Sequence, residues 1–492
     1  MVEYIKINPK DNVAVALCDL TEGSTCLGVT LLQNISKGHK FALENIKQRQ
    51  NVIKYGAPIG SAKQDISVGE HVHTHNMATN LSGQLTYCYS PVESKAIEHC
   101  QNRTIQVYPR YDGNVGIRNE LWVIPLVGCV NSQARAIVKR FEKLHPVLQN
   151  VDGVHAFTHP YGCSQMGADH VRTRTLLQQM ATHPNCGGVL LLGLGCENNR
   201  LDEFIQTLGN YDKNRVRFLI AQDVEDEIAS GIELLEELYQ YVQMDKREPR
   251  DMSCLRVGLK CGGSDGLSGI TANPLVGMFS DYIVSCGGTT VLTEVPEMFG
   301  AEQLLMDRCI DEQTFNKTVK LINNFKQYYQ DNNQPCYENP SPGNKAGGIT
   351  TLEDKSLGCT QKSGSSVVCG VALDGEKIEH SGLNLLNGPG NDMVAVTNLG
   401  CAGCHLVLFT TGRGTPFGGF VPTVKISTNS QLANHKSNWI DFDAGSIVAG
   451  DSFESKLEQF VEYIQQVASG KPTKNELTDS REIALFKTGV TL

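Results

Sequence analysis

The most constraining feature of the sequence is an alternation of short apolar runs with segments of helical periodicity, from about residue 114 to the C-terminus. The runs at 189–194 and 216–220 are apolar enough for buried strands. Between 224 and 242, apolar residues recur at helical spacing, and the same pattern returns at 453–464. Strands that alternate with amphipathic helices are typical of an α/β domain with a mainly parallel sheet.

The first part of the chain has a different pattern. Residues 1–93 contain short alternating runs, such as 13–17 and 52–55, between glycines, which predicts a small barrel-like β module. Residues 94–113 are polar and irregular, so we expect a linker there. The remainder, 114–492, is the α/β region.

Composition excludes several classes of function. The formal net charge is −10 and the pI is about 5.7, so the chain has no basic field with which to hold nucleic acid or an acidic membrane surface. The N-terminal residues lack the apolar core of a signal peptide, and no apolar run is long enough to cross a bilayer. We therefore expect a cytoplasmic protein, with the 17 cysteines as thiols, most of them buried.

Four expected strands run directly into loops rich in glycine, cysteine, asparagine and charge. These loops are 158–165, 195–199, 260–266 and 410–416. Any one of them alone is more often a tight turn. In a single parallel sheet, however, all four would meet at the edge formed by the strands' carboxyl ends, where α/β proteins bind ligands.

Three histidines alternate at the end of the β module. On a strand, His71, His73 and His75 would share one face and could bind a metal or act in proton transfer. A surface cluster without function is an equally good interpretation of the pattern.

Three nucleotide or cofactor motifs are excluded. The segment 401–405 matches the haem attachment pattern, but His405 begins an apolar run that predicts a buried strand, which leaves no room for haem. No Walker loop and no dinucleotide-binding glycine motif lies between a strand and a helix.

Taken together, the glycine-rich motifs resemble the family of altronate and galactarate dehydratases and sulfolactate sulfo-lyases, over essentially the whole chain. The motifs that carry the resemblance are 38–43, 52–56, 69–73, 161–165, 193–199, 261–266, 338–348, 357–362 and 411–416. Pro160 departs from the family pattern, where we expect threonine, and many cysteines lie outside the motifs.

The resemblance implies an N-terminal β-clip module of the SAF type, a middle segment and a Rossmann-like C-terminal domain. It also implies ferrous iron, which manganese can replace, and activity under reducing conditions. The partner is a small sugar acid, and a homodimer is compatible with the resemblance. The implied reaction is the dehydration of a sugar acid to a 2-keto-3-deoxy acid in hexuronate catabolism, and we expect altronate to be the best substrate.

Dehydration needs a base, an acid and a group that stabilises the enediolate. We expect His73 or His75 to transfer protons or bind metal, and Lys345 and Lys362 to neutralise the carboxylate or the enediolate. Arg413 would clamp a carboxylate. The expected hydroxyl-recognition or supporting residues are Asn344, Asp265, Ser264, Glu197 and Asn198.

Iron ligation leaves two alternatives. Either a single ferrous ion is held by histidine, carboxylate and water, with His71, His73 and His75 as candidates, or Cys163, Cys196 and Cys359 hold a labile iron–sulfur cluster. The competing functions are galactarate dehydratase, sulfolactate lyase and a sugar-acid-binding protein without catalysis.

Overall fold

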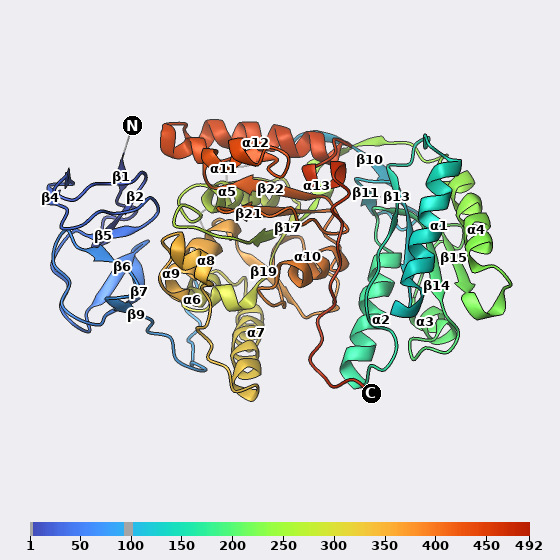
Figure 1. The fold of residues 1–492 in the computed structure, drawn as a ribbon, viewed down its shortest axis with the longest axis horizontal. Helices are drawn as coiled ribbons and strands as arrows, with labels where there is room; N and C mark the ends of the chain where they lie inside the picture. Colours follow the sequence, from blue (N-terminus) through green and yellow to red (C-terminus); the bar gives the residue numbers. More distant parts are fainter. Residues whose placement is uncertain (1–2, 93–101) are drawn as a thin grey trace.

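The computed structural model describes residues 3–92 and 102–492, which form three bodies in a row (Figure 1). The N-terminal β module lies at one end and an α/β body formed by the middle of the chain at the other. The C-terminal α/β body lies between them. The expected order, a small β module followed by α/β structure with parallel sheets, is confirmed.

The N-terminal module is built from short antiparallel strands. One sheet has the order β1-β2-β5-β8, another β6-β7-β9, and β3 pairs with β4. Small apolar cores around Phe41 and Ile59 fill the space between them. The strands are β1 (Tyr4–Ile5), β2 (Val13–Ala16), β3 (Thr25–Cys26), β4 (Val29–Thr30), β5 (Lys40–Ala42), β6 (Asn51–Lys54), β7 (Ala57–Ala62), β8 (His71–Val72) and β9 (Met77–Ala78).

The expected linker contains a strand, so this part of the sequence prediction is wrong. Residues 93–101 lie outside the described residues, but β10 (Thr104–Pro109) pairs with β11 (Val115–Gly116) and β16 (Glu248–Asp251). Ile105 and Val107 alternate with the exposed Thr104 and Gln106 and are fully buried, which stabilises the strand.

The middle body is a four-stranded parallel sheet with the order β13-β12-β14-β15. Apolar clusters on both faces of the sheet pack against its helices. The elements are β12 (Glu120–Pro125), η1 (Gly128–Val130), α1 (Asn131–Leu144), β13 (Gly153–Ala156), α2 (Gly167–Ala181), β14 (Cys186–Gly193), α3 (Leu201–Thr207), β15 (Val216–Ile220), η2 (Ala221–Asp223) and α4 (Glu227–Val242).

The C-terminal body is a seven-stranded parallel sheet with the order β19-β20-β18-β17-β21-β22-β23. Its strands are β17 (Arg256–Cys261), β18 (Thr289–Leu292), β19 (Val368–Ala372), β20 (Gly382–Leu386), β21 (Leu406–Thr411), β22 (Thr423–Ser427) and β23 (Phe442–Asp443). Its helices are η3 (Met252–Cys254), α5 (Ala272–Ser285), η4 (Val295–Met298), α6 (Glu302–Met306), α7 (Glu312–Asp331), α8 (Pro342–Ala346), α9 (Leu352–Cys359), η5 (Thr360–Ser363), α10 (Asp392–Cys401), α11 (Ser430–His435), η6 (Gly445–Ala449), α12 (Phe453–Ala468) and α13 (Lys474–Leu477).

The presence of two parallel sheets corrects the expectation that four loops meet at one edge. The loops 158–165 and 195–199 follow strands of the middle sheet, whereas 260–266 and 410–416 follow strands of the C-terminal sheet. The periodicity of a strand is the same in either sheet, so the pattern of alternation cannot show where one sheet ends and another begins.

A buried charge network joins the N-terminal module to the C-terminal body. Lys40 and Lys54 of the module form ion pairs of 2.8 and 3.0 Å with Asp354 of α9, and all three side chains are buried. Lys40 also donates to the carbonyl of Gly348 at 2.8 Å. The family motifs 38–43, 52–56 and 338–348 therefore contribute residues that hold the two bodies together.

The segment 401–405 is structural. Cys401 and Cys404 are fully buried, and His405 is buried at the start of β21, as the rejection of haem attachment requires. Among the described residues, no helix is both long enough and apolar enough to cross a membrane.

Candidate functional site

A cavity of about 770 Å³ opens at the carboxyl end of the C-terminal sheet. Loops that follow β17, β20 and β21 line it, together with the segment 338–345 and Lys355 of α9. The chain connects β17 to β18 on one side, while β21 leads to β22 on the other, so the cavity lies at a topological switch point of the sheet. Its polar lining includes Asn344, Lys345 and Asp392.

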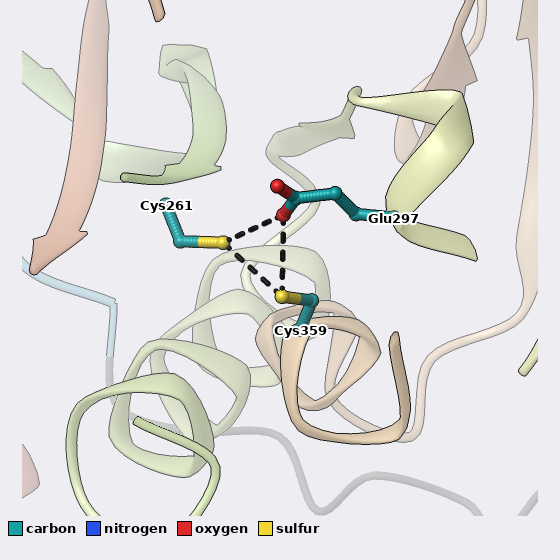
Figure 2. A group of neighbouring side chains, drawn as sticks. All are labelled: Cys261, Glu297 and Cys359. Atoms are coloured by element: carbon teal, nitrogen blue, oxygen red, sulfur yellow. Dashed lines mark hydrogen bonds between the residues drawn. The ribbon is translucent and has the colours of Figure 1, made fainter. Parts of the chain in front are cut away.

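The floor of the cavity contains two thiols and a carboxylate that point toward one another (Figure 2). The sulfur atoms of Cys261 and Cys359 are 3.3 Å apart, and Oε2 of Glu297 lies 3.0 and 3.2 Å from them. All three residues are buried. Within the described parts of the chain, this is the one group of three or more histidine, cysteine or acidic side chains whose ligand atoms are within 4.8 Å of one another.

Two buried lysines balance the charge of this floor. Lys362 donates to the sulfur of Cys261 at 2.8 Å, and Lys355 pairs with Glu297 at 2.7 Å. Burial alone would lower the pKa of Lys362, but the sulfurs of Cys261 and Cys359 raise it above its usual value, so the lysine stays charged. Lys362 is buried, so it is not a solvated surface charge, and its catalytic role stays a prediction.

The same charges act on the acidic groups. Burial alone would raise the pKa of Glu297, but Lys355 and Lys362 hold it well below its usual range. The hydrogen bond with Cys261, together with burial, raises the pKa of Cys359 well above that of an ordinary thiol. The floor is thus an ionised carboxylate beside a protonated Cys359 and charged lysines.

Local sequence explains why these groups converge. Gly262 follows β17, and a Cβ there would lie 2.6 Å from both the carboxylate of Asp392 and the ring of Phe409, so only glycine lets the chain pass. The N-cap of helix α9 is Thr351, whose hydroxyl accepts from the backbone N–H of Asp354 at 3.3 Å. This helix carries Lys355 and Cys359 to the cavity.

Of the predicted substrate-binding residues Asn344 and Ser264, only Asn344 lines the cavity. Asn344 lines the cavity, but its side chain also donates to the carbonyl of Ser264 at 2.8 Å and caps α8. The hydroxyl of Ser264 is buried and has no hydrogen-bond partner among the described residues.

Arg413 and Asp265 face a second hollow of about 390 Å³, not the cavity. Asp265 is buried and accepts hydrogen bonds from Thr428 at 2.9 and 3.0 Å and from Ser268 at 3.1 Å. Burial raises the pKa of its carboxyl. The contacts of Asp265 join two loops, so its position does not support the predicted role in hydroxyl recognition. Arg413 lines this second hollow, whereas Lys345 lines the cavity.

The predicted histidines gather where the N-terminal module meets the C-terminal body. His71 belongs to β8, but the backbone N–H of Met77 bonds to the carbonyl of His73 at 2.9 Å, so His73 and His75 lie in a turn and the strand geometry that we expected is wrong. The rings nevertheless cluster, with centroids 5.6 Å apart for His71 and His73 and 5.4 Å for His71 and His75.

Burial keeps two of these imidazoles neutral. It lowers the pKa of His71 to about 4 and that of His73 to about 3. Nδ1 of His73 lies 3.0 Å from the hydroxyl of Thr350. No histidine is among the residues that line the cavity. The catalytic and metal-binding roles of His71, His73 and His75 therefore stay predictions.

The remaining candidates lie on the middle body. Cys163 and Cys196 are exposed, and Asn198 accepts from the backbone of Ser164 at 2.8 Å. Glu197 accepts from the backbone of Leu194 at 2.9 Å, which closes its own turn. Cys359 lies in the C-terminal body on α9, toward the opposite end of the molecule (Figure 1), so the predicted cluster of Cys163, Cys196 and Cys359 does not form.

Known proteins resemble the chain along its whole length. The profile of the altronate/galactarate dehydratase SAF domain matches residues 2–80, that of the D-galactarate dehydratase/altronate hydrolase second domain 107–243, and that of the D-galactarate/altronate dehydratase C-terminal domain 252–491. An altronate dehydratase of Escherichia coli is 59% identical, with 100% of both chains covered.

The chain belongs to the altronate/galactarate dehydratase family. An altronate dehydratase of Bacillus subtilis is 51% identical over 100% of both chains. A galactarate dehydratase (L-threo-forming) of Escherichia coli is 33% identical and covers 95% of this chain and 93% of its own. The expected SAF-type module is confirmed by the first of the three domain profiles.

Sequence reasoning missed several residues of this family member's cavity. Cys261 belongs to the family motif 261–266, but the sequence does not distinguish it as a ligand beside Cys359. Glu297 and Lys355 lie outside the family motifs, and only the fold brings them to the two thiols. Lys355 did carry a signal, because it lies four residues before Cys359, one turn away on the same helix face.

Proposed function

We propose that this protein is an altronate dehydratase, a hydro-lyase that converts D-altronate to 2-keto-3-deoxy-D-gluconate and water in hexuronate catabolism. The observation that carries the proposal is the cavity at the end of β17, in which Lys345 and Lys355 lie above the Cys261–Cys359–Glu297 floor. Its volume of about 770 Å³ is ample for a six-carbon acid.

Loss of the proton next to a carboxylate creates an enediolate whose charge must be stabilised. Lys345 and Lys355 supply positive charge at the cavity wall, and Lys362 supplies it below Cys261. Two lining groups can accept the proton, the carboxylates of Glu338 and Asp392.

We also propose that Cys261, Cys359 and Glu297 would hold the ferrous ion that the family resemblance implies. Three donor atoms lie within 3.3 Å of one another, and two of the three residues line the cavity, so the donor set fits one ion with positions open to a substrate. When bound, ferrous iron polarises the carboxylate and hydroxyl of a chelated substrate. Metal binding would release the thiol protons, and two thiolate ligands would favour iron over manganese, which prefers oxygen ligands.

Galactarate dehydratase is the second candidate within the family. Its substrate has carboxylates at both ends, so it needs an additional cation. The basic residues that line the cavity are Lys345 and Lys355, whereas Arg413 faces the neighbouring hollow. This arrangement, together with 59% against 33% identity, favours altronate. A cytoplasmic location is part of the proposal, because exposed thiols suit a reducing compartment.

The experiment is anaerobic loading with ferrous iron, followed by a 2-keto acid assay with altronate, galactarate, mannonate and sulfolactate. We expect the highest kcat/KM with altronate. A preference for galactarate of more than about tenfold, equivalent to about 1.4 kcal/mol, would overturn the substrate assignment. Absence of turnover with all four acids would favour a binding protein without catalysis.

A further inference from the structure

Three cysteines at one edge of the middle sheet are exposed. Sixteen of the 17 cysteines lie in the described residues, and the exposed ones among them are Cys88, Cys129, Cys163 and Cys196. Cysteine is among the residues most often buried. Since three of these four thiols lie on three neighbouring loops, their exposure needs a chemical reason.

The sheet order places the three loops side by side. Cys129 follows β12, Cys163 follows β13 and Cys196 follows β14, and β12 is the strand between the other two. Pro125 of β12 pairs with Leu192 of β14, and Cys129 and Cys196 each lie four residues beyond that pair. Parallel strands bring all three loops to the same edge.

Hydrogen bonds between the loops fix them against one another. The backbone N–H of Gly128 donates to Tyr161 at 2.8 Å, and that of Asn199 donates to Gly162 at 2.9 Å. A Cβ on Gly162 would lie 2.0 Å from the carbonyl of Leu126, so the loops pack backbone against backbone. The thiols are therefore carried by a rigid edge.

The positive ends of two helices also lie at this edge. Helices α1 and α2 begin shortly after Cys129 and Cys163, and the partial positive charge of a helix N-terminus is a favourable neighbour for a negatively charged group.

We propose that Cys129, Cys163 and Cys196 are the three protein ligands of a [4Fe–4S] cluster, in which the fourth iron has no cysteine ligand. In this assignment Cys129 takes the place that sequence analysis gave to Cys359. The three sulfurs are not among the groups of described ligand atoms within 4.8 Å of one another, so they are spaced too widely for a single tetrahedral ion. A cubane is larger, and its ligand sulfurs are correspondingly further apart.

A hollow of about 500 Å³ lies beside Cys196 and gives small ions access to this edge. Gly195, Glu197 and Arg200 also line it. This site is separate from the dehydratase cavity, and the inference does not depend on the proposed substrate.

The test is anaerobic reconstitution of the full chain with ferrous iron, ferric iron and sulfide. Two ferrous ions, two ferric ions and four sulfides make the 2+ cluster, and the three thiols release three protons on binding. Compared with protein loaded with iron in the absence of sulfide, we expect about four additional iron ions and about four acid-labile sulfides per chain. The reconstituted protein should also show broad visible absorption that air bleaches. Replacement of Cys129, Cys163 or Cys196 by Ala should lower iron and sulfide together at least about fivefold, whereas Cys88→Ala, at an exposed thiol elsewhere, should change neither.

A second measurement needs no variant. Alkylation followed by mass spectrometry should show Cys129, Cys163 and Cys196 protected in reconstituted protein and modified in untreated protein, with Cys88 modified in both. Iron bound without labile sulfide, or full sulfide retained in all three alanine variants, would overturn the proposal. In Cys261→Ala, a loss of iron without a loss of sulfide would show that the cavity has lost its ion while the cluster on the middle sheet is retained.

Discussion

The ammonium of Lys362 donates a hydrogen bond of 2.8 Å to the sulfur of Cys261, and both side chains are buried below the cavity. Lys362 also lies 3.7 Å from Glu294. A charge fixed at this depth is already oriented before substrate arrives, which is the condition under which electrostatic stabilisation contributes most to catalysis.

Lys362→Met should therefore lower kcat/KM for altronate at least about 10²-fold, because removing one preorganised charge or donor usually costs that much. Steady-state assays of the iron-loaded enzyme measure the effect. Lys246→Met removes an exposed lysine and should leave turnover unchanged. Thermal unfolding of both variants separates a catalytic loss from misfolding, and near-normal turnover of a folded Lys362→Met would exclude the role.

Asp354→Asn should destabilise the protein by about 3–5 kcal/mol, since it leaves Lys40 and Lys54 as buried cations without a charged partner. Denaturant unfolding monitored by circular dichroism measures this change. The matched control is Asp65→Asn, which breaks an exposed pair with Lys47 and should not shift the midpoint. Equal midpoints for the two variants would mean that the network does not join the bodies.

Stability should fall as pH drops from about 6.5 toward 3. Burial, with Arg256 nearby, lowers the pKa of His405 to about 3. Between that value and the ordinary pKa of 6.5 the unfolded chain binds a proton that the folded chain does not, so acid favours unfolding. Burial lowers the pKa of His183 in the same way.

The variant His405→Gln isolates this contribution. It should lower stability at neutral pH, because Nδ1 of His405 accepts from the backbone N–H of Arg256 at 3.0 Å. Its melting temperature should nevertheless depend less on pH between 6.5 and 4 than that of the native chain. Identical slopes in the two proteins would show that His405 titrates normally.

Local elements were predictable from the sequence, and the site only in part. The strand at 216–220 has the predicted bounds, and α4 and α12 occupy the predicted helical stretches, because each has a strong apolar period. Glu297 was not predictable, since its carboxylate meets Cys261 through pairing of β17 with β18, a contact that no local pattern encodes. Because local patterns do not encode which sheet a strand joins, the sequence also could not show that Cys359 lies in a different body from Cys163 and Cys196.

The most direct test of the account compares kcat/KM for altronate in three variants at three different places. Lys345→Ala removes a half-buried charge from the cavity, Arg413→Ala an exposed one from the neighbouring hollow, and Glu197→Gln a carboxylate from the middle body. We predict a fall of at least about 10²-fold for Lys345→Ala and less than about fivefold for the other two, because charge stabilisation requires proximity to the reacting atoms. A large loss in Glu197→Gln with normal turnover in Lys345→Ala would contradict the account and place the reaction at the edge of the middle sheet.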